Sequence, residues 1–459
     1  MTLEISRSEA ALTAVSQLGP AFIEAVEART ATIGVLGLGY VGLPLAEAFV
    51  EAGFKVMGFD IAAAKVEALE AGHSYIRHIT DARVAAMNAT QRFSATADFE
   101  RLDEPDALIL CVPTPLTIHR DPDLTYVIKT AEAVAKTLRR GQLVILESTT
   151  YPGTTEEVVI PILEKGGLVA GVDFAVAYSP EREDPGNPNF STTSIPKVVG
   201  ANSEAERLMA LALYTSFTKT VPVSDLRTAE AVKLTENIFR LINIGLVNEL
   251  KFVFGGMDID VWEVIDAART KPFGFMAFYP GPGVGGHCIP IDPFYLTWKA
   301  RGYGLSTRMI DLAGDIVAAL PRAVVEKTAE TLDERLAKPL CRSRILIVGL
   351  AYKKNVDDLR ESPALPIIEL LLRRGALVDY YDPHIPTPDA VAHEHPNIAA
   401  MRCVDWDAAT FKRFDCAIVL TEHSNIDYEP LLQSVPFVVD TRNALAHLGD
   451  RYGYKIVKG

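Results

Sequence analysis

Cysteine is scarce in this chain of 459 residues, and the few cysteines are scattered. They form an odd number without a CxxC pair: Cys111, Cys288, Cys341, Cys403 and Cys416. That pattern argues against a disulfide framework and against a zinc knuckle. His384, His393 and His395 lie in a proline-rich stretch without cysteine support, so we expect them to be solvated and expect no metal site.

Long apolar runs and an excess of positive charge are also missing. No run reaches the length of a membrane span, and the first 30 residues lack the basic-then-apolar layout of a signal peptide. The formal net charge of -14 repels polyanions. We therefore expect a cytoplasmic protein without membrane insertion or nucleic-acid binding. An anionic small ligand would need local basic residues and glycine N–H groups.

The hydrophobic share of 49% supports two or three domains with large cores. Strand-like runs alternate with helical patterns, which predicts an α/β fold: two Rossmann-like doubly wound domains joined by a long central helix and a helical region. The predicted divisions are an N-terminal extension over residues 1–30, followed by 31–220, 221–335 and 336–459. Expected strands cover residues 32–36, 55–59, 107–112, 143–147, 174–178, 344–350, 377–381, 415–421 and 437–440. In the extension, a helix is expected to break at Gly19 and Pro20.

A glycine motif lies between the first strand and a predicted helix over residues 43–51. It consists of Gly37, Leu38, Gly39, Tyr40, Val41 and Gly42. The next strand ends in Asp60, 18 residues past the last glycine. A lone GxGxxG is a weak signal, but strand, glycines, helix, strand and acid in this order are typical of dinucleotide binding. The helix N-terminus would hold a diphosphate, and Asp60 would accept hydrogen bonds from a ribose diol.

Asp60 also bears on the choice of cofactor. A carboxylate there repels a 2′-phosphate, which favours NAD over NADP, although Lys65 in the next helix leaves NADP open. Thr114 and Thr149 follow later strands and are candidate cofactor contacts, yet hydroxyls at such positions also cap helices. Glu181 lies in a carboxylate-rich loop, which is a solvated turn unless it faces a reactive group.

Residues 281–292 are too rich in glycine and proline for a helix or a regular strand, and they contain Cys288. Glycines let backbone approach a ligand, while prolines keep such a loop stiff. Cys288 is then a thiol held against a ligand, in contrast to the buried small hydrophobe that most cysteines are. His287 is adjacent, but neighbours in sequence point apart, which disfavours it as a base.

A long helix is expected over residues 228–254, with apolar residues around much of its surface. Such a helix connects domains and favours a homodimer. Lys233 and Asn237 stand four residues apart on one face, either as functional groups or as a snorkelling lysine beside a polar neighbour. A second helical stretch over residues 305–336 is expected to kink or break at Pro321.

The last α/β unit lacks a GxGxxG motif, because Gly349 stands alone after its first strand. We expect this unit to bind substrate and not a second cofactor. Its strand-end loops carry Tyr352, Lys353, Arg360 and Arg442. The lysine and the two arginines could hold phosphates, although charged residues in loops are often only solvated.

Together these parts resemble the nucleotide-sugar 6-dehydrogenases of the UDP-glucose dehydrogenase family, over residues 32–457. The resemblance rests on residues 37–42, 233–237, 285–288 with Asp292, and 352–354 followed by 360–362. It implies oxidation of a sugar CH2OH to a carboxylate with two NAD, supplying surface polysaccharide synthesis.

The resemblance also implies roles for individual residues. Lys233, Asn237 and Asp292 would position a water and assist proton removal. Cys288 would form a thiohemiacetal and then a thioester, which water hydrolyses with Glu181 as base. Arg360 matches a position near the cofactor. The implied substrate contacts are Glu181, Arg182, Lys233, Asn237, Gly283, Gly285, Tyr352, Lys353 and Arg442.

Two positions depart from the UDP-glucose members, which carry a second glutamate at Pro185 and an arginine from the neighbouring subunit at Pro272. Both changes free volume and remove charge beside the sugar, as a 2-acetamido group requires. The chain therefore looks more similar to members acting on UDP-N-acetylglucosamine, with UDP-glucose as the runner-up. A cross-subunit contact through Arg269 or Lys271 stays open.

Two rival functions share part of this pattern. A β-hydroxyacid dehydrogenase would share the NAD domain and the lysine-asparagine helix, but it has no need of Cys288 or Asp292. A catalytically silent NAD-binding sensor would need none of Lys233, Asn237 and Cys288.

Overall fold

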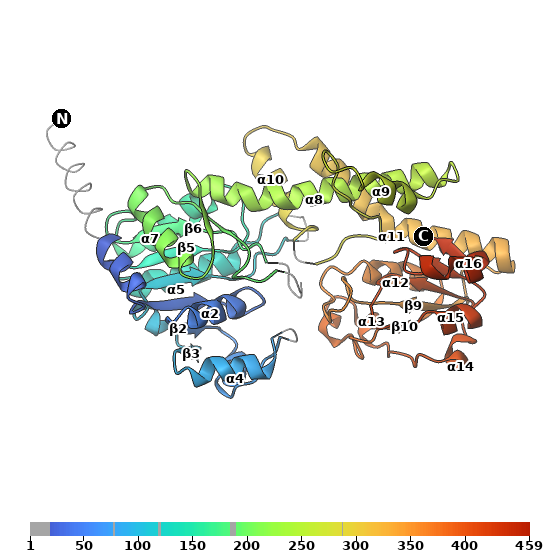
Figure 1. Cartoon of the computed structure of the whole chain (residues 1–459), viewed down its shortest axis with the longest axis horizontal. Helices are drawn as coiled ribbons and strands as arrows, with labels where there is room; N and C mark the ends of the chain where they lie inside the picture. Colours follow the sequence, from blue (N-terminus) through green and yellow to red (C-terminus); the bar gives the residue numbers. More distant parts are fainter. Residues whose placement is uncertain (1–18, 77–78, 118–120, 184–189, 287) are drawn as a thin grey trace. The chain divides into compact units, whose positions relative to one another are not determined.

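A computed structural model describes residues 19–459 except 77–78, 118–120, 184–189 and 287 (Figure 1). The chain divides into two compact units. Unit 1 contains the residues up to Glu236 together with Phe294–Gly304. Unit 2 contains Asn237–Pro293 and Leu305–Gly459.

Unit 1 is built on a six-stranded parallel sheet. Its strands are β1 (Thr32–Leu36), β2 (Lys55–Phe59), β3 (Phe93–Thr96), β4 (Ala107–Leu110), β5 (Leu143–Leu146) and β6 (Ala175–Tyr178). The order is β3-β2-β1-β4-β5-β6, so the direction of winding reverses between β1 and β4. In open sheets of this kind, ligands bind outside the carboxyl ends of the strands at that reversal.

The strands of unit 1 are short apolar runs because both faces of the sheet are covered. Ile33 and Val35 belong to one core with Phe49 of the first helix, while Leu36 belongs to a second core with Phe174. Alternate residues of one strand therefore serve opposite cores, as expected for a buried parallel strand. The helices are α2 (Gly42–Glu51), α3 (Ala63–Glu70), α4 (Asp81–Ala89), α5 (Thr125–Thr137), α6 (Ile160–Leu163) and α7 (Glu204–Thr215). A small parallel pair, β7 (Lys197–Val199) and β8 (Thr220–Pro222), accompanies them.

Four further helices follow along the chain. They are α8 (Leu226–Gly255), α9 (Val261–Ala268), α10 (Asp292–Arg301) and α11 (Arg308–Leu336). Helix α8 begins in unit 1 and ends in unit 2, as expected for a connecting helix. Helix α11 continues through Pro321 as a single helix, so a break at this residue is wrong, while the kink, the other form of the prediction, stays a prediction. A proline removes one backbone hydrogen bond, and the buried apolar positions on both sides of it, such as Ile310 and Val324, keep the helix packed.

Unit 2 contains a second parallel sheet of five strands. They are β9 (Arg344–Val348), β10 (Leu377–Tyr381), β11 (Cys416–Val419), β12 (Val438–Asp440) and β13 (Ile456–Lys458), in the order β10-β9-β11-β12-β13. Its helices are α12 (Ala364–Arg373), α13 (Pro396–Ala399), α14 (Ala408–Phe411), α15 (Glu429–Ser434) and α16 (Gly449–Tyr452). The predicted α/β class with two Rossmann-like sheets is confirmed.

Several predicted details differ from the structure. Gly19 and Pro20 are helical together with residues 21–27, and because residues 1–18 lie outside the described part, the break expected at this pair stays a prediction. Strands β3, β7, β8 and β13 were not predicted, because each has three or four residues and no long apolar run. Within the part of the chain that the structure describes, no helix is both long and apolar enough to cross a membrane.

Candidate functional site

The three glycines of the motif after β1 have different surroundings: two are required by packing and one faces open space. A Cβ on Gly42 would lie 1.9 Å from the carbonyl oxygen of Gly37, and a Cβ on Gly37 would lie 2.7 Å from that of Cys111. Gly37 also has a φ of +94°, which favours glycine. A Cβ on Gly39 would meet no described atom within 4 Å. The fold itself thus requires Gly37 and Gly42, while Gly39 leaves space for a ligand.

Asp60, at the end of β2, ties this motif to the sheet. Its Oδ2 accepts hydrogen bonds from Leu38 N at 3.0 Å and Lys65 Nζ at 3.0 Å, and its Oδ1 accepts one from Ala62 N at 2.9 Å. The Tyr75 hydroxyl donates to the Leu38 carbonyl. Lys65 therefore compensates part of the Asp60 charge that was expected to repel a 2′-phosphate.

These features fit a dinucleotide. Among the described residues, no atom lies near a Cβ on Gly39, no side-chain hydrogen bond caps the start of α2 at Val41, and three bonds leave the Asp60 carboxylate one acceptor position. Thr114 follows β4 in the same unit, and its carbonyl accepts a hydrogen bond from Tyr295 Oη at 2.9 Å. Thr149 follows β5 and is half-buried.

Glu181 is buried after β6, which corrects the alternative of a solvated turn. Its Oε1 accepts hydrogen bonds from Arg182 N and Glu183 N, both at 2.6 Å. Its Oε2 accepts one from Lys197 Nζ at 2.9 Å. Burial raises its pKa, but the charge and hydrogen bond of Lys197 bring the pKa below the usual value. Glu181 is therefore held as a carboxylate.

Lys233 lies against Glu181. The Lys233 ammonium, on α8, donates a hydrogen bond to the backbone carbonyl of Glu181 and is buried. Arg182 forms an ion pair with Glu236 at 2.6 Å and donates to the Pro196 carbonyl at 2.8 Å. The snorkelling alternative for Lys233 is wrong, because its ammonium is inside the protein and bound to a loop carbonyl.

A second cluster lies in unit 2 and contains three predicted catalytic residues. Asn237 Nδ2 donates to Asp292 Oδ2, and Asp292 N donates to the carbonyl of Cys288 at 2.8 Å. Arg240 donates to the amide oxygen of Asn237, which fixes the orientation of this amide. Asp292 is the first residue of α10, a helix that was not predicted. Asn237 and Asp292 are buried, while Cys288 is half-buried.

The loop that carries Cys288 is close-fitting because side chains of its own unit press against its glycines. A Cβ on Gly281 would lie 2.6 Å from Arg442 Nη1, and one on Gly283 would lie 2.7 Å from Pro363 Cβ. On Gly285 it would lie 2.6 Å from Tyr352 Cβ. The structure therefore brings Gly283, Gly285, Tyr352 and Arg442 together, and here the glycines allow the approach of side chains. His287, Pro185 and the rest of residues 184–189 lie outside the described residues.

Basic side chains gather around this part of unit 2. Burial lowers the pKa of Arg442, whose Nε donates to the Leu420 carbonyl at 3.0 Å. Burial and the charge of Arg442 lower the pKa of Lys251, on α8, to about 8. Arg360 pairs with Asp358, with Nε 2.9 Å from both carboxylate oxygens, and Lys353 lies in the same half-buried loop.

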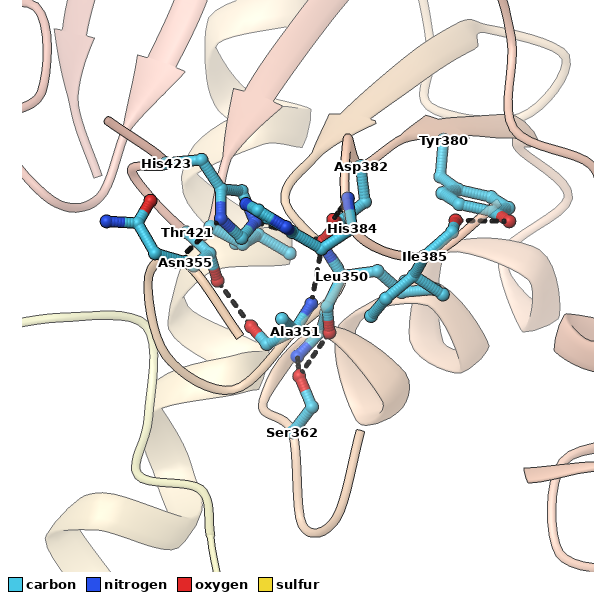
Figure 2. A network of polar contacts seen from close by, with 12 residues as sticks. Leu350, Ala351, Asn355, Ser362, Tyr380, Asp382, His384, Ile385, Thr421 and His423 are labelled. Atoms are coloured by element: carbon cyan, nitrogen blue, oxygen red, sulfur yellow. Dashed lines mark hydrogen bonds and ion pairs between the residues drawn. The ribbon is translucent and has the colours of Figure 1, made fainter. Parts of the chain in front are cut away.

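Asp382 follows β10 in unit 2 as Asp60 follows β2 in unit 1, but its hydrogen-bond partners differ. Asp382, after β10, accepts hydrogen bonds from Leu350 N at 2.7 Å and Ala351 N at 3.0 Å, and it lies 3.0 Å from His423 Nε2 (Figure 2). Asn355 N donates to the other nitrogen of His423 at 2.9 Å. Together with His384 N, which donates to Asp382 Oδ1 at 2.8 Å, these partners fill the acceptor positions of the carboxylate that would otherwise face a ribose. Asp382 therefore has a structural role in unit 2.

Two histidines were wrongly expected to be solvated. His384 lies in the network of Figure 2, with its ring 4.8 Å from that of His423. His395 Nδ1 lies 2.6 Å from Glu369 Oε1 and is half-buried. His393 is exposed, as expected.

Sequence analysis missed three residues that surround the predicted groups. Glu147 and Lys197 form a buried ion pair at 2.8 Å beside Glu181, and Lys251 lies beside Arg442. The available signals were a glutamate directly after the apolar β5 and a lysine at the start of the buried β7. Neither signal says which groups meet in space.

Comparison with known proteins agrees with this geometry across most of the chain. Three domain models of the UDP-glucose/GDP-mannose dehydrogenase family match: the NAD-binding domain over residues 31–218, the central domain over 227–317 and the UDP-binding domain over 346–447. The chain belongs to this family. It is thus an NAD-dependent oxidoreductase of UDP-sugars, and the predictions of family, NAD and a UDP-sugar substrate are confirmed.

Individual relatives differ in their sugar. The chain is 38% identical over 368 residues to the UDP-N-acetyl-D-glucosamine 6-dehydrogenase of Pseudomonas aeruginosa, covering 79% of this chain and 85% of that protein. It is 36% identical over 392 residues to the UDP-N-acetyl-D-mannosamine dehydrogenase of Pyrococcus horikoshii, covering 82% and 91%. The structure of a UDP-D-ManNAc dehydrogenase from P. horikoshii superposes with a TM-score of 0.82 at 33% identity, covering 90% of this chain and 96% of that one.

Proposed function

We propose that the enzyme oxidises the C6 hydroxymethyl group of UDP-N-acetylglucosamine to a carboxylate, in the cytoplasm, for surface polysaccharide synthesis. The observation that carries the proposal is the cluster in which Asp292 binds the Asn237 amide and the backbone of Cys288. A single oxidation of an alcohol needs no thiol, whereas two successive oxidations need a group that retains the aldehyde.

In the first half of the reaction, the alcohol loses a proton and a hydride. Gly39 and Asp60 would hold NAD, which would supply the hydride acceptor for each half. Asn237 and Asp292 orient a water that removes the proton. The Lys233 ammonium stabilises the alkoxide that develops.

In the second half, Cys288 Sγ adds to the aldehyde carbon, and the resulting hydroxyl carries the proton. Loss of a hydride from the carbon of this thiohemiacetal and of the proton from its hydroxyl gives a thioester, and the proton passes to water. Water then adds to the thioester carbonyl, the carbon–sulfur bond breaks, and the thiolate leaves. Glu181 takes the proton of the water, a role that suits the carboxylate that Lys197 keeps ionised.

We propose that the UDP group is bound by Tyr352, Lys353 and Arg442, with Gly283, Gly285 and Arg182 near the sugar and Arg360 near the cofactor. The contacts of Gly281 and Gly285 with Arg442 and Tyr352 support this grouping. Thr114, Thr149 and residues 37–42 are the proposed cofactor contacts. The divisions at residues 30, 220 and 335 stay predictions.

The choice of sugar is tested by comparing kcat/KM for UDP-N-acetylglucosamine, UDP-N-acetylgalactosamine, UDP-N-acetylmannosamine and UDP-glucose. The name of the Pseudomonas relative and the absence of an arginine at Pro272 support the first of these sugars. We expect the highest value for UDP-N-acetylglucosamine, with two NADH formed per uronate. A preference for UDP-glucose would overturn the substrate, and one NADH per product would overturn the second oxidation. UDP-glucose oxidation is the alternative function.

We also propose a homodimer. Unit 2 exposes many large apolar side chains on α8, in the connection between α8 and α9, on α9 and in the segment after α9: Phe239, Leu246, Phe252, Val253, Met257, Ile259, Val264, Phe273, Phe275, Met276 and Tyr279. A surface of this composition is typical of an interface, and a second copy would cover it. Light scattering after gel filtration should give twice the mass of 50.0 kDa, and a monomeric mass would contradict the proposal.

A further inference from the structure

A buried lysine in unit 1 joins two carboxylates that follow different strands. Lys197 begins β7, while Glu147 follows β5 and Glu181 follows β6. Lys197 Nζ lies 2.8 Å from Glu147 Oε2 and 2.9 Å from Glu181 Oε2. The side chains of Lys197, Glu147 and Glu181 are 4%, 0% and 11% exposed, so the three charges are shielded from solvent. A buried charge requires such partners, because desolvating it alone is costly.

The ammonium of Lys197 is itself held in place. Tyr214, on α7, donates its hydroxyl to the second oxygen of Glu147, and its ring centroid lies 5.3 Å from Lys197 Nζ. Burial raises the pKa of Glu147 to about 7 despite the pull of Lys197. The charges of Lys233, of Cys111 after β4 and of Glu183 also act on this cluster. Lys197 thus has one firm position between Glu147 and Glu181.

The hydrogen bonds of the Glu181 carboxylate leave one acceptor position for a further donor. An ionised carboxylate offers about four acceptor positions, two on each oxygen. Arg182 N and Glu183 N take both positions of Oε1, and Lys197 takes one position of Oε2. Among the described residues, the remaining position lies on the oxygen that Lys197 holds. A water that gives its proton to Glu181 is therefore directed by Lys197.

We infer that Lys197 is a positioning residue that fixes Glu181 Oε2 as the proton acceptor for hydrolysis of the Cys288 thioester. The inference rests on the proposed function, in which Glu181 takes the proton of the attacking water. Glu147 and Tyr214 act through Lys197 and touch neither substrate nor cofactor in this scheme. The role is specific to the last step, so the two hydride losses do not depend on it.

The test mixes UDP-N-acetylglucosamine and NAD with the full-length parent enzyme or with Lys197→Met, Lys197→Arg, Glu181→Gln and the double variant Lys197→Met/Glu147→Gln. The double variant removes the excess negative charge that could prevent folding of the single methionine variant. Rapid mixing measures the NADH burst and the steady state, and intact mass after quenching measures the adduct on Cys288.

We expect Lys197→Met, alone or with Glu147→Gln, to lower the steady-state rate roughly 10- to 100-fold, the range for a misplaced catalytic group. The burst of two NADH per site should persist, the adduct should accumulate, and Lys197→Arg should restore most of the rate. Accumulation in Glu181→Gln but not in folded Lys197→Met variants would overturn the inference and leave the proposed function standing. A uniform fall of burst and steady state in the Lys197 variants would overturn it in favour of a structural role. Absence of the adduct in every variant, Glu181→Gln included, would overturn the inference together with the assigned role of Glu181.

Discussion

Gly285 and Tyr352 lie in direct contact, since a Cβ on Gly285 would come within 2.6 Å of the Tyr352 Cβ. The contact is continued by Gly286 N, which donates to the Arg360 carbonyl at 3.0 Å. Through these two contacts, the loop that carries Cys288 and the loop that follows β9 form one packed body in unit 2. A change in the proposed nucleotide-binding loop will therefore also displace the thiol.

The first prediction concerns the thiol. Replacing Cys288 by Ser or Ala should abolish release of uronate, because no thioester can form, while NAD binding stays intact. Product analysis and NAD titration measure the two effects. Cys341→Ala is the matched control, because Cys341 is an exposed free cysteine and should be replaceable without loss. Equal uronate yield from the Cys288 variants would remove the thiol from the mechanism.

The second prediction concerns Lys233. Lys233→Ala should lower kcat by ~10² to 10⁴, or about 3 to 5.5 kcal/mol, because one positioned charged group is lost. Lys233→Met should be equally slow, since it keeps the volume and removes only the ammonium. The Glu181 carbonyl also loses its donor, which costs about 1 to 3 kcal/mol of stability. Thermal melts separate this effect from catalysis, and near-normal kcat in a folded Lys233→Met variant would make the lysine structural.

A third prediction uses two glycines of the cofactor cradle as a matched pair. Gly39→Ala should shift Tm by less than about 2 °C, because its Cβ meets no described atom, but it should weaken NAD binding about tenfold, or about 1.4 kcal/mol. Gly42→Ala should lower stability by about 2 kcal/mol or more, because its Cβ would overlap Gly37 O. Calorimetric titration and melting curves measure both. Unchanged NAD affinity in Gly39→Ala would place the diphosphate elsewhere.

The fourth prediction concerns cofactor choice. Asp60→Asn keeps an acceptor for Leu38 N but removes the negative charge, so the preference for NAD over NADP should narrow about tenfold in kcat/KM, or about 1.4 kcal/mol. Lys65→Met should act in the opposite direction, because Lys65 offsets the charge of Asp60. If the parent enzyme uses NADP as well as NAD, the assigned role of Asp60 is wrong.

The last prediction concerns the pH dependence of stability. Burial raises the pKa of Glu230 to about 7, although Thr155 N and Gly153 N donate to it. Because the folded state then binds this proton more tightly than the unfolded chain, stability is full below pH about 4.5 and is lost as pH rises through about 7. The loss at pH 8 is about 2 to 3 kcal/mol.

Glu230→Gln isolates this contribution. Urea unfolding at pH 5 and pH 8 should show a smaller drop for Glu230→Gln than for the parent. Glu70→Gln, a change of an exposed carboxylate whose charge does not act on Glu230, is the control and should follow the parent. An identical drop in the parent and in Glu230→Gln would show that Glu230 is ionised throughout this range.

The fold was predictable from sequence where a single strand, helix or short motif has a characteristic residue pattern. Strands such as β1 and β4 are apolar because both of their faces are buried, and Asp60 closes a motif contained within about 30 residues. Strands β1, β2 and β10 have the predicted bounds, whereas β4, β5, β9 and β11 end one or two residues before the predicted ends. A break at Pro321 does not occur because packing along α11 outweighs one lost hydrogen bond.

The candidate site was predictable only where sequence neighbours act together. Lys233 and Asn237 share a helix, and Cys288 and Asp292 share a turn, so their spacing was informative. Lys197 is 50 residues from Glu147 and 16 from Glu181, and only the strand order β5-β6 with β7 nearby brings the three together. No periodic pattern in the sequence predicts contacts between residues so far apart along the chain.

The structural use of Asp382 has a kinetic consequence. The carboxylate of Asp382 is already bound by Leu350 N, Ala351 N, His384 N and His423. Within the described residues, Asp382 thus has no acceptor position left for a ribose, and only the cradle of Asp60 in unit 1 is assigned to a dinucleotide. The two oxidations in the proposed scheme must then use this one cofactor site in succession. The partly oxidised sugar has to remain at the active site, bound to Cys288, while NADH is exchanged for NAD. The lifetime of that covalent intermediate, set against the exchange rate of the cofactor, would decide whether the enzyme releases acid or leaks aldehyde.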